Sequence, residues 1–177
     1  AKALEGELVV SLALHDIADR PKQWIAGGTA ADAVVARRGA DVVVVAVPEN
    51  ARPKQATLAG NALGEIDLGA LDATVLASGA DAVAVFDAGV EEWKLLIAAA
   101  LGGLGRQALK LASEYACERI QFGQPIGQFQ AISHPLADCL CEVDGGKLFL
   151  WKTIRDLVDG APEAGANISA ALWQASQ

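Results

Sequence analysis

The stretch Arg119-Ile-Gln-Phe-Gly-Gln-Pro-Ile-Gly-Gln-Phe-Gln130 separates two long helical patterns, and the rest of the chain is organised around it. Gly123, Pro125 and Gly127 lie within five positions of one another. Pro125 removes a backbone donor and disfavours helix at the residue before it, so the stretch cannot be continuous helix. We therefore predict a connection between two antiparallel helices.

This connection also carries side chains suited to a ligand. Arg119 offers a planar fork of donors that matches a phosphate, and Phe122 and Phe129 offer apolar faces. The residues alone leave two interpretations open, a site for a phosphorylated, ring-bearing ligand or the plain closure of a helical hairpin. Four side-chain amides accompany them: Gln121, Gln124, Gln128 and Gln130.

The same segment resembles a known family. The pattern Tyr115-Ala-x-x-Arg-x-Gln-Phe-Gly-x-Pro-Ile-x-x-Phe-Gln130, followed by Leu136-Ala-Asp138, is similar to a segment of the acyl-CoA dehydrogenases. In that family the segment joins two helices of the C-terminal helical domain, and its loop reaches the FAD of the neighbouring subunit. The resemblance thus implies a flavoprotein and a second subunit that shares the FAD site. It implies cofactor-binding roles for Arg119, Gln121, Phe122 and Gln130, the last at the adenosine part.

A second segment, Lys22-Gln-Trp-Ile-Ala-Gly-Gly-Thr-Ala-Ala-Asp32, resembles the flavin-facing part of the same family's middle domain. The resemblance places Trp24 near the isoalloxazine ring and Ile25 and Ala26 along its edge. The family often has a hydroxyl residue at the Ala26 position, bonded to flavin N5, whereas alanine leaves only its backbone N–H. Without the resemblance, Trp24 is better interpreted as a strand aromatic in a barrel core.

Residues 1–86 predict a small β domain. Short apolar or alternating runs recur between turns with glycine and aspartate, which is typical of an antiparallel barrel or sandwich. The run 41–47 is almost wholly β-branched, so we expect a strand buried on both faces. The expected strands are residues 8–14, 23–26, 30–36, 41–47, 64–68, 72–76 and 81–86.

Residues 87–177 predict a helical bundle, which makes the fold class α+β. Asp87 is a good N-cap for a helix over 88–118, and helices over 131–159 and 164–177 follow. The core faces expected from helical spacing comprise Leu104, Ala108, Leu111, Ala112, Tyr115, Ile132, Leu136, Leu140, Val143, Leu150, Ile154 and Leu157. Three glycines that each cost about 1 kcal/mol of helix propensity are expected to face a neighbouring helix or subunit: Gly102, Gly103 and Gly105. By resemblance, the chain is the family's middle domain plus the first part of a truncated C-terminal helical domain, without the N-terminal helical domain.

Composition excludes some classes of function. The net charge is −8 and the pI about 4.7, so a nucleic-acid surface is not expected. We find no signal peptide and no run as long as a membrane span, and expect no membrane partner. The odd set Cys117, Cys139 and Cys141 is expected to be small buried hydrophobes with free thiols, as in the reducing cytoplasm, and no metal site is expected.

The resemblance implies an oxidoreductase of fatty acid metabolism. Its reaction is α,β-dehydrogenation of an acyl-CoA thioester, with proton abstraction by a carboxylate and hydride transfer to flavin, in a homo- or hetero-oligomer. The base stays unknown: the position used by the isovaleryl-type branch holds Trp93, which cannot accept a proton, and Glu91 and Glu92 are rotated away around the helix. Lys94 stands where the family often has an arginine near the CoA phosphates, although it could equally be a solvated lysine.

Whether this chain is itself an enzyme is therefore left open by the sequence. An alternative is a non-catalytic partner subunit that completes another subunit's FAD site or stabilises an assembly; the lack of a base and Ala26 favour it. A plain helical-hairpin protein with a β domain is the third interpretation.

Overall fold

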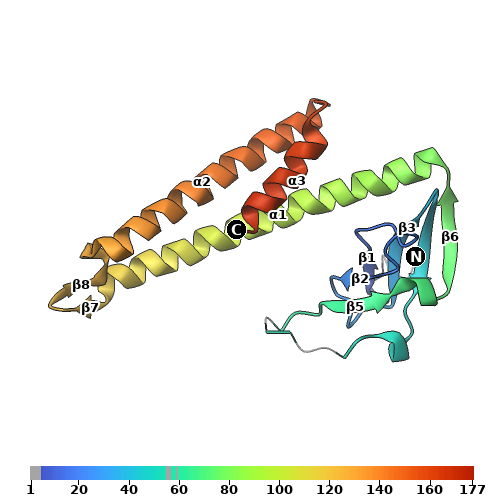
Figure 1. Ribbon diagram of the computed structural model, residues 1–177, viewed down its shortest axis with the longest axis horizontal. Coiled ribbons are helices and arrows are strands. Elements are labelled where there is room, and N and C mark those ends of the chain that lie inside the picture. The colour runs from blue at the N-terminus through green and yellow to red at the C-terminus, as the bar shows by residue number, and fades with distance from the viewer. Residues whose placement is uncertain (1–4, 55–56, 59) are drawn as a thin grey trace. The chain divides into compact units, whose positions relative to one another are not determined.

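The computed structural model describes residues 5–54, 57–58 and 60–177, and the chain forms two compact units (Figure 1). The first unit ends at Val90 and the second runs from Glu91 to Gln177. A 39-residue helix, α1 (Ala80–Glu118), passes through the boundary. The α+β class is confirmed.

The first unit is built from two small sheets. Four strands form one sheet in the order β1-β3-β4-β6: β1 (Val10–Leu12), β3 (Ala33–Arg38), β4 (Asp41–Ala46) and β6 (Ala73–Ser78). β2 (Lys22–Ile25) and β5 (Gly64–Asp67) form an antiparallel pair. The β3–β4 and β4–β6 pairs are antiparallel, whereas β1 and β3 are parallel. The described strands form open sheets rather than a closed barrel, and two 3₁₀ turns, η1 (Glu49–Ala51) and η2 (Leu68–Ala70), connect them.

The core of this unit lies on one face of the larger sheet. Val43 and Val45 of β4 are fully buried, while the alternating Val42 and Val44 are only half-buried. The expectation that this strand is buried on both faces is therefore wrong, because no second layer fully covers the other side of the sheet. The fully buried core side chains include Ala13, Ile25, Ala31, Val34, Ala36 and Leu68.

The last strand expected from the sequence is also wrong. Residues 81–86 form the first turns of α1, which begins at Ala80. A short apolar run such as this one fits a buried helix as well as a strand, and periodicity alone does not separate them. Asp87 consequently lies inside the helix rather than at its N-cap, and its carboxylate is 3.4 Å from Nη1 of Arg37.

The second unit is a helical hairpin with a short third helix. The later part of α1 and α2 (Gln130–Val158) flank the 119–130 connection, and α3 (Ala164–Ala175) packs against α2 (Figure 1). Two side-chain contacts fasten α3: Ser169 Oγ accepts a bond from Lys94 Nζ at 3.2 Å, and Asn167 donates to Asp156 at 2.8 Å. A small core forms where the helices meet: Leu95, Ala98, Thr153, Ala164, Ile168 and Ala171.

Much of the predicted helical core face is exposed in this chain. A hairpin of two long helices with one short helix offers too little surface to cover it. The exposed members are Leu104, Ala108, Leu111, Ala112, Tyr115, Ile132, Leu140 and Leu157. All three cysteines are exposed as well, so their expected burial is wrong. A Cβ at Gly102 or Gly103 would meet nothing within 4 Å, whereas one at Gly105 would lie 3.6 Å from Val143.

α1 is also long and apolar enough to cross a membrane by length and composition, with a mean hydropathy of 1.3 over an 18-residue window. The expectation that no segment reaches that length was wrong, because the helix tolerates a few charges within the window. One such helix is weak evidence for a membrane span, since a core helix of a soluble protein passes the same test. Of this window, 11% is buried within the structure, whereas the core helix of a soluble protein is mostly buried.

Candidate functional site

The connection between α1 and α2 is a tight β-hairpin. β7 (Ile120–Gln121) pairs with β8 (Gln124–Pro125), and the two residues between them have positive φ, 51° at Phe122 and 83° at Gly123. Two positive φ angles in a two-residue loop define a type I′ turn, in which a phenylalanine is unusual. The left-handed conformation costs a residue with a Cβ about 1–2 kcal/mol. The hairpin thus holds Phe122 in a strained conformation with 93% of its surface exposed.

Contacts at its base make the hairpin rigid. The Arg119 N–H donates to the Tyr115 carbonyl at 2.9 Å, and the Ile126 N–H donates to the Arg119 carbonyl at 2.8 Å. Gly127 lies so close to the end of α1 that a Cβ there would be 3.1 Å from the Ala116 carbonyl oxygen. The rings of Phe122 and Phe129 meet edge to face with centroids 6.0 Å apart, a favourable aromatic geometry.

Two polar side chains of the connection, those of Arg119 and Gln130, are free for an external acceptor or donor. Within the described part of the chain, the exposed Arg119 guanidinium makes no hydrogen bond or ion pair, and neither does the Gln130 amide. Gln121 donates to the adjacent Ile120 carbonyl at 2.8 Å. Phe129 provides no side-chain cap for α2, while its backbone carbonyl accepts the N–H groups of Ile132, at 2.9 Å, and Ser133, at 3.0 Å. A rigid loop with a free guanidinium and an exposed ring is suited to a phosphorylated aromatic ligand.

In the β unit, the strand β2 presents Trp24 to the outside. Trp24 is 51% exposed, so it does not lie in the core as the alternative interpretation required. The Ile25 side chain is fully buried, so only its backbone could face a ligand. Ala26 is exposed, and its carbonyl accepts a hydrogen bond from the Ser11 hydroxyl. A Cβ at Gly28 would lie 2.8 Å from the Ile25 carbonyl oxygen, so this turn requires glycine.

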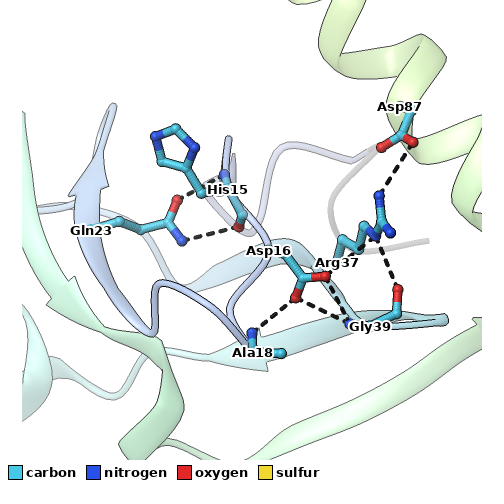
Figure 2. Close-up of polar contacts among 7 residues, drawn as sticks. All are labelled: His15, Asp16, Ala18, Gln23, Arg37, Gly39 and Asp87. Atoms are coloured by element: carbon cyan, nitrogen blue, oxygen red, sulfur yellow. Dashed lines mark hydrogen bonds and ion pairs between the residues drawn. The ribbon is translucent and has the colours of Figure 1, made fainter.

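A polar network that the sequence analysis missed supports β2 (Figure 2). The Asp16 carboxylate accepts from the N–H groups of Ala18, at 2.9 Å, and of Gly39, at 3.0 Å. Arg37 lies between Asp16 and Asp87, with 3.4 Å to each carboxylate. These bonds join the loop before β2, the β3–β4 turn and the first turns of α1. An aspartate two residues before a turn N–H was a local signal for part of this network.

Gln23, the neighbour of Trp24, belongs to the same region and is 5% exposed. Its amide bonds three backbone groups of the loop before β2, two of them on His15 (Figure 2). The polar residue at an inward position of an alternating strand was the signal that the sequence offered for it.

Asp32, at the end of the Lys22–Asp32 segment, is held in its ionised form. Its carboxylate accepts the Val9 N–H at 2.7 Å and pairs with the Arg52 guanidinium. The Val9 bond, followed by the Arg52 contact, lowers the pKa of Asp32 below its usual value, against an opposing contribution from burial. Through these contacts Asp32 joins Val9, just before β1, to Arg52, just after η1.

The residues considered for catalysis and substrate binding lie on α1. The Lys94 ammonium is 2.7 Å from Glu91 and also donates to Ser169, so it is already engaged and is not a freely solvated lysine. Trp93 is half-buried and Glu92 is exposed. Within the described ranges, no group of three His, Cys, Asp or Glu side chains could hold a metal ion.

Comparisons with known proteins assign the chain to a family. The family model for the acyl-CoA dehydrogenase C-terminal domain matches residues 83–177, more than half of the chain. The chain therefore belongs to the acyl-CoA dehydrogenase family. Acyl-CoA dehydrogenase FadE12 of Mycobacterium tuberculosis is 39% identical over 99 residues, which are 54% of this chain and 26% of the relative. Mitochondrial isovaleryl-CoA dehydrogenase of Oryza sativa is 35% identical over 86 residues, 49% of this chain and 21% of the relative.

Solved structures extend the likeness to the β unit. The ChsE4–ChsE5 complex of Mycobacterium tuberculosis matches 98% of this chain with a TM-score of 0.75 and 23% identity. PigA with FAD and proline matches 99% of the chain with a TM-score of 0.73 and 19% identity. At these identities the likeness shows the fold alone. The chain spans 53% and 55% of those two chains, about half of their length.

Proposed function

We propose that this chain forms part of an FAD-dependent acyl-CoA dehydrogenase that oxidises an acyl-CoA thioester between its α and β carbons. The observation that carries the proposal is the Arg119 guanidinium, which is free and exposed on a rigid hairpin beside the exposed, strained ring of Phe122. The ring of Phe122 touches Phe129 by an edge contact and is otherwise 93% exposed, and backbone strain of this kind often marks a ligand site.

Each proposed cofactor residue is assigned one part of the ligand. Arg119 would bind the phosphates, with Gln121 and Phe122 beside it, and Gln130 would hold the adenosine part. In the β unit, the half-exposed Trp24 offers a face for the isoalloxazine and Ala26 offers backbone at its edge, whereas Ile25 offers backbone alone. Bound FAD would supply the hydride acceptor, and these residues would bind and orient it.

The family's fold supports a shared site, with FAD held between two subunits. The ChsE4–ChsE5 neighbour is a complex of two different chains. We therefore propose that this chain works in a homo- or hetero-oligomer and takes an acyl-CoA as substrate. The net charge of −8 argues against a nucleic-acid partner, and we propose a cytoplasmic location. Lys94 keeps a proposed secondary role near the CoA phosphates, which would require its ammonium to leave or share the contact with Glu91.

Visible absorption of the purified protein, with and without added FAD, tests the cofactor proposal. We expect flavin bands perturbed from those of free FAD, and a weaker affinity in Arg119→Ala. A hydrogen bond to a charged group is worth about 1.5–3 kcal/mol, so the dissociation constant should rise about tenfold or more. Arg106→Ala is the matched control, because Arg106 is also an exposed arginine of this unit without a bonded partner in the described residues. Equal FAD affinity in the two variants would contradict the role of Arg119.

A second candidate function is a non-catalytic partner subunit. Trp93 at the expected base position, which is half-buried and cannot accept a proton, and Ala26 without a hydroxyl favour it. FAD uptake with no oxidation of straight-chain or branched acyl-CoAs by this chain alone would support this candidate. Turnover by the chain alone would exclude a non-catalytic partner and would mean that a carboxylate of this chain serves as the base.

A further inference from the structure

Gln23 is a buried amide at an inward-facing position of β2. Its Oε1 accepts the His15 N–H at 3.1 Å, and its Nε2 donates to the carbonyls of His15, at 3.1 Å, and Arg20, at 2.9 Å. Figure 2 shows the paired bonds to His15, which resemble one rung of a sheet ladder. With both amide hydrogens and the carbonyl oxygen used, Gln23 is satisfied where an unpaired amide would be costly.

Besides Gln23, the burial of Ile25 in the core of the β unit sets the register of β2. β2 pairs with β5 over four residues in a two-stranded sheet, and such an isolated pair is marginal by itself. Side chains alternate along the strand, with Gln23 and Ile25 inward and Lys22 and Trp24 outward. A slip of one residue would turn Trp24 inward and expose Ile25.

The three hydrogen bonds of Gln23 lower the free energy of the observed β2 register relative to registers shifted by one or two residues. Any slip moves the amide away from the three backbone groups and leaves them without their partner, which burial makes unfavourable. A leucine at this position would bury comparable surface without distinguishing the registers in this way. The bonds therefore act on the placement of the next side chain along the strand, that of Trp24.

We propose that Gln23 is a positioning residue, which fixes the register of β2 and so holds the Trp24 indole on the outer face of the β unit as a stacking platform. The effect on Trp24 stands on the geometry alone; its consequence for flavin binding rests on the proposed function.

The test follows Trp24 directly, by the ¹⁵N-indole NMR signal that disappears in Trp24→Phe. In Gln23→Leu we expect this signal to shift and broaden or split as the indole samples more than one environment. The control is Thr153→Val in the helical unit, which removes another fully buried side-chain bond, that of Thr153 Oγ1 to the Phe149 carbonyl at 2.8 Å. An unchanged Trp24 signal in Gln23→Leu would overturn the proposal.

Gln23→Glu gives an independent readout, also if Gln23→Leu does not fold. At neutral pH the introduced carboxylate would face the His15 and Arg20 carbonyls and lose both donated bonds, and protonation in acid would restore one donor. The Trp24 signal of Gln23→Glu should therefore move toward that of the native protein as the pH falls, and by more than the native signal moves over the same range, where the cross-strand neighbour Glu65 can contribute. A Trp24 signal that does not respond to pH in Gln23→Glu would count against the proposal.

FAD titration separates this proposal from the proposed function. If the positioning role and the proposed function both hold, Gln23→Leu should raise the dissociation constant for FAD about tenfold, which corresponds to the free energy of roughly one to two hydrogen bonds. Thr153→Val should leave it unchanged. A displaced Trp24 signal with unchanged FAD affinity, or with no FAD uptake by the native chain, would keep the positioning role and overturn the flavin contact at Trp24.

Discussion

The β unit and the helical unit bury their apolar side chains to very different extents. In the first, Ile25, Val34, Val43 and Leu68 are completely buried in a core supplied by the unit itself. In the second, large side chains such as Leu104 and Leu111 on α1 are more than half exposed. The β unit is therefore stabilised by its own core, whereas the long helices present apolar surface that further packing would cover.

Shortening one apolar side chain in each unit should give the largest difference in the free energy of unfolding. Ile25→Ala removes a completely buried side chain and should lower the free energy of unfolding by about 2–5 kcal/mol. Leu104→Ala removes a side chain that is 66% exposed and should change it by less than about 0.5 kcal/mol. Urea denaturation of both variants checks the pair. A large loss in Leu104→Ala would mean that copies of the chain already cover this face in solution.

The two candidate cofactor-binding segments also differ between the units. Trp24 lies on a strand whose other face is buried in the core, whereas Phe122 lies in a strained turn. Phe122→Gly should gain about 1–2 kcal/mol from relief of the left-handed strain and lose the edge contact with Phe129, worth about 0.5–1.5 kcal/mol, while weakening FAD binding through loss of the ring. Phe122→Leu keeps the strain and removes the ring, so it should weaken FAD binding without the gain in stability. Thermal unfolding and FAD titration measured together separate strain from stacking; equal FAD affinity in all three proteins would remove Phe122 from the site.

The sequence predicted different parts of the molecule with different success, and the reasons are physical. Alternation and turn residues placed most strands within a few residues, and the Gly-Pro-Gly spacing correctly placed the helix connection. The run 81–86 was assigned to a strand because a short apolar run has no decisive period. The hydrogen bonds of Gln23 and Asp16 were not predicted, because they reach backbone groups that only the fold brings close. Exposure along α1 depends on tertiary packing, which helical spacing alone does not determine.

The smallest expected effect compares two carboxylates, one in each unit. The pKa of Asp32 is lowered by the Val9 N–H and Arg52, and the pKa of Asp156 by Lys152 and Asn167, in both cases against burial. A lowered folded-state pKa means that the stabilisation is present above the unfolded value, near 3.8, and is lost as the pH falls through the folded value. Asp32→Asn should therefore flatten the acid side of the stability profile of the β unit, and Asp156→Asn that of the helical unit. Unfolding midpoints between pH 2 and pH 6, followed by signals from each unit, check this assignment. If either variant also flattened the pH dependence of unfolding in the other unit, the two units would unfold together. That result would contradict the expectation that the β unit is stabilised by its own core.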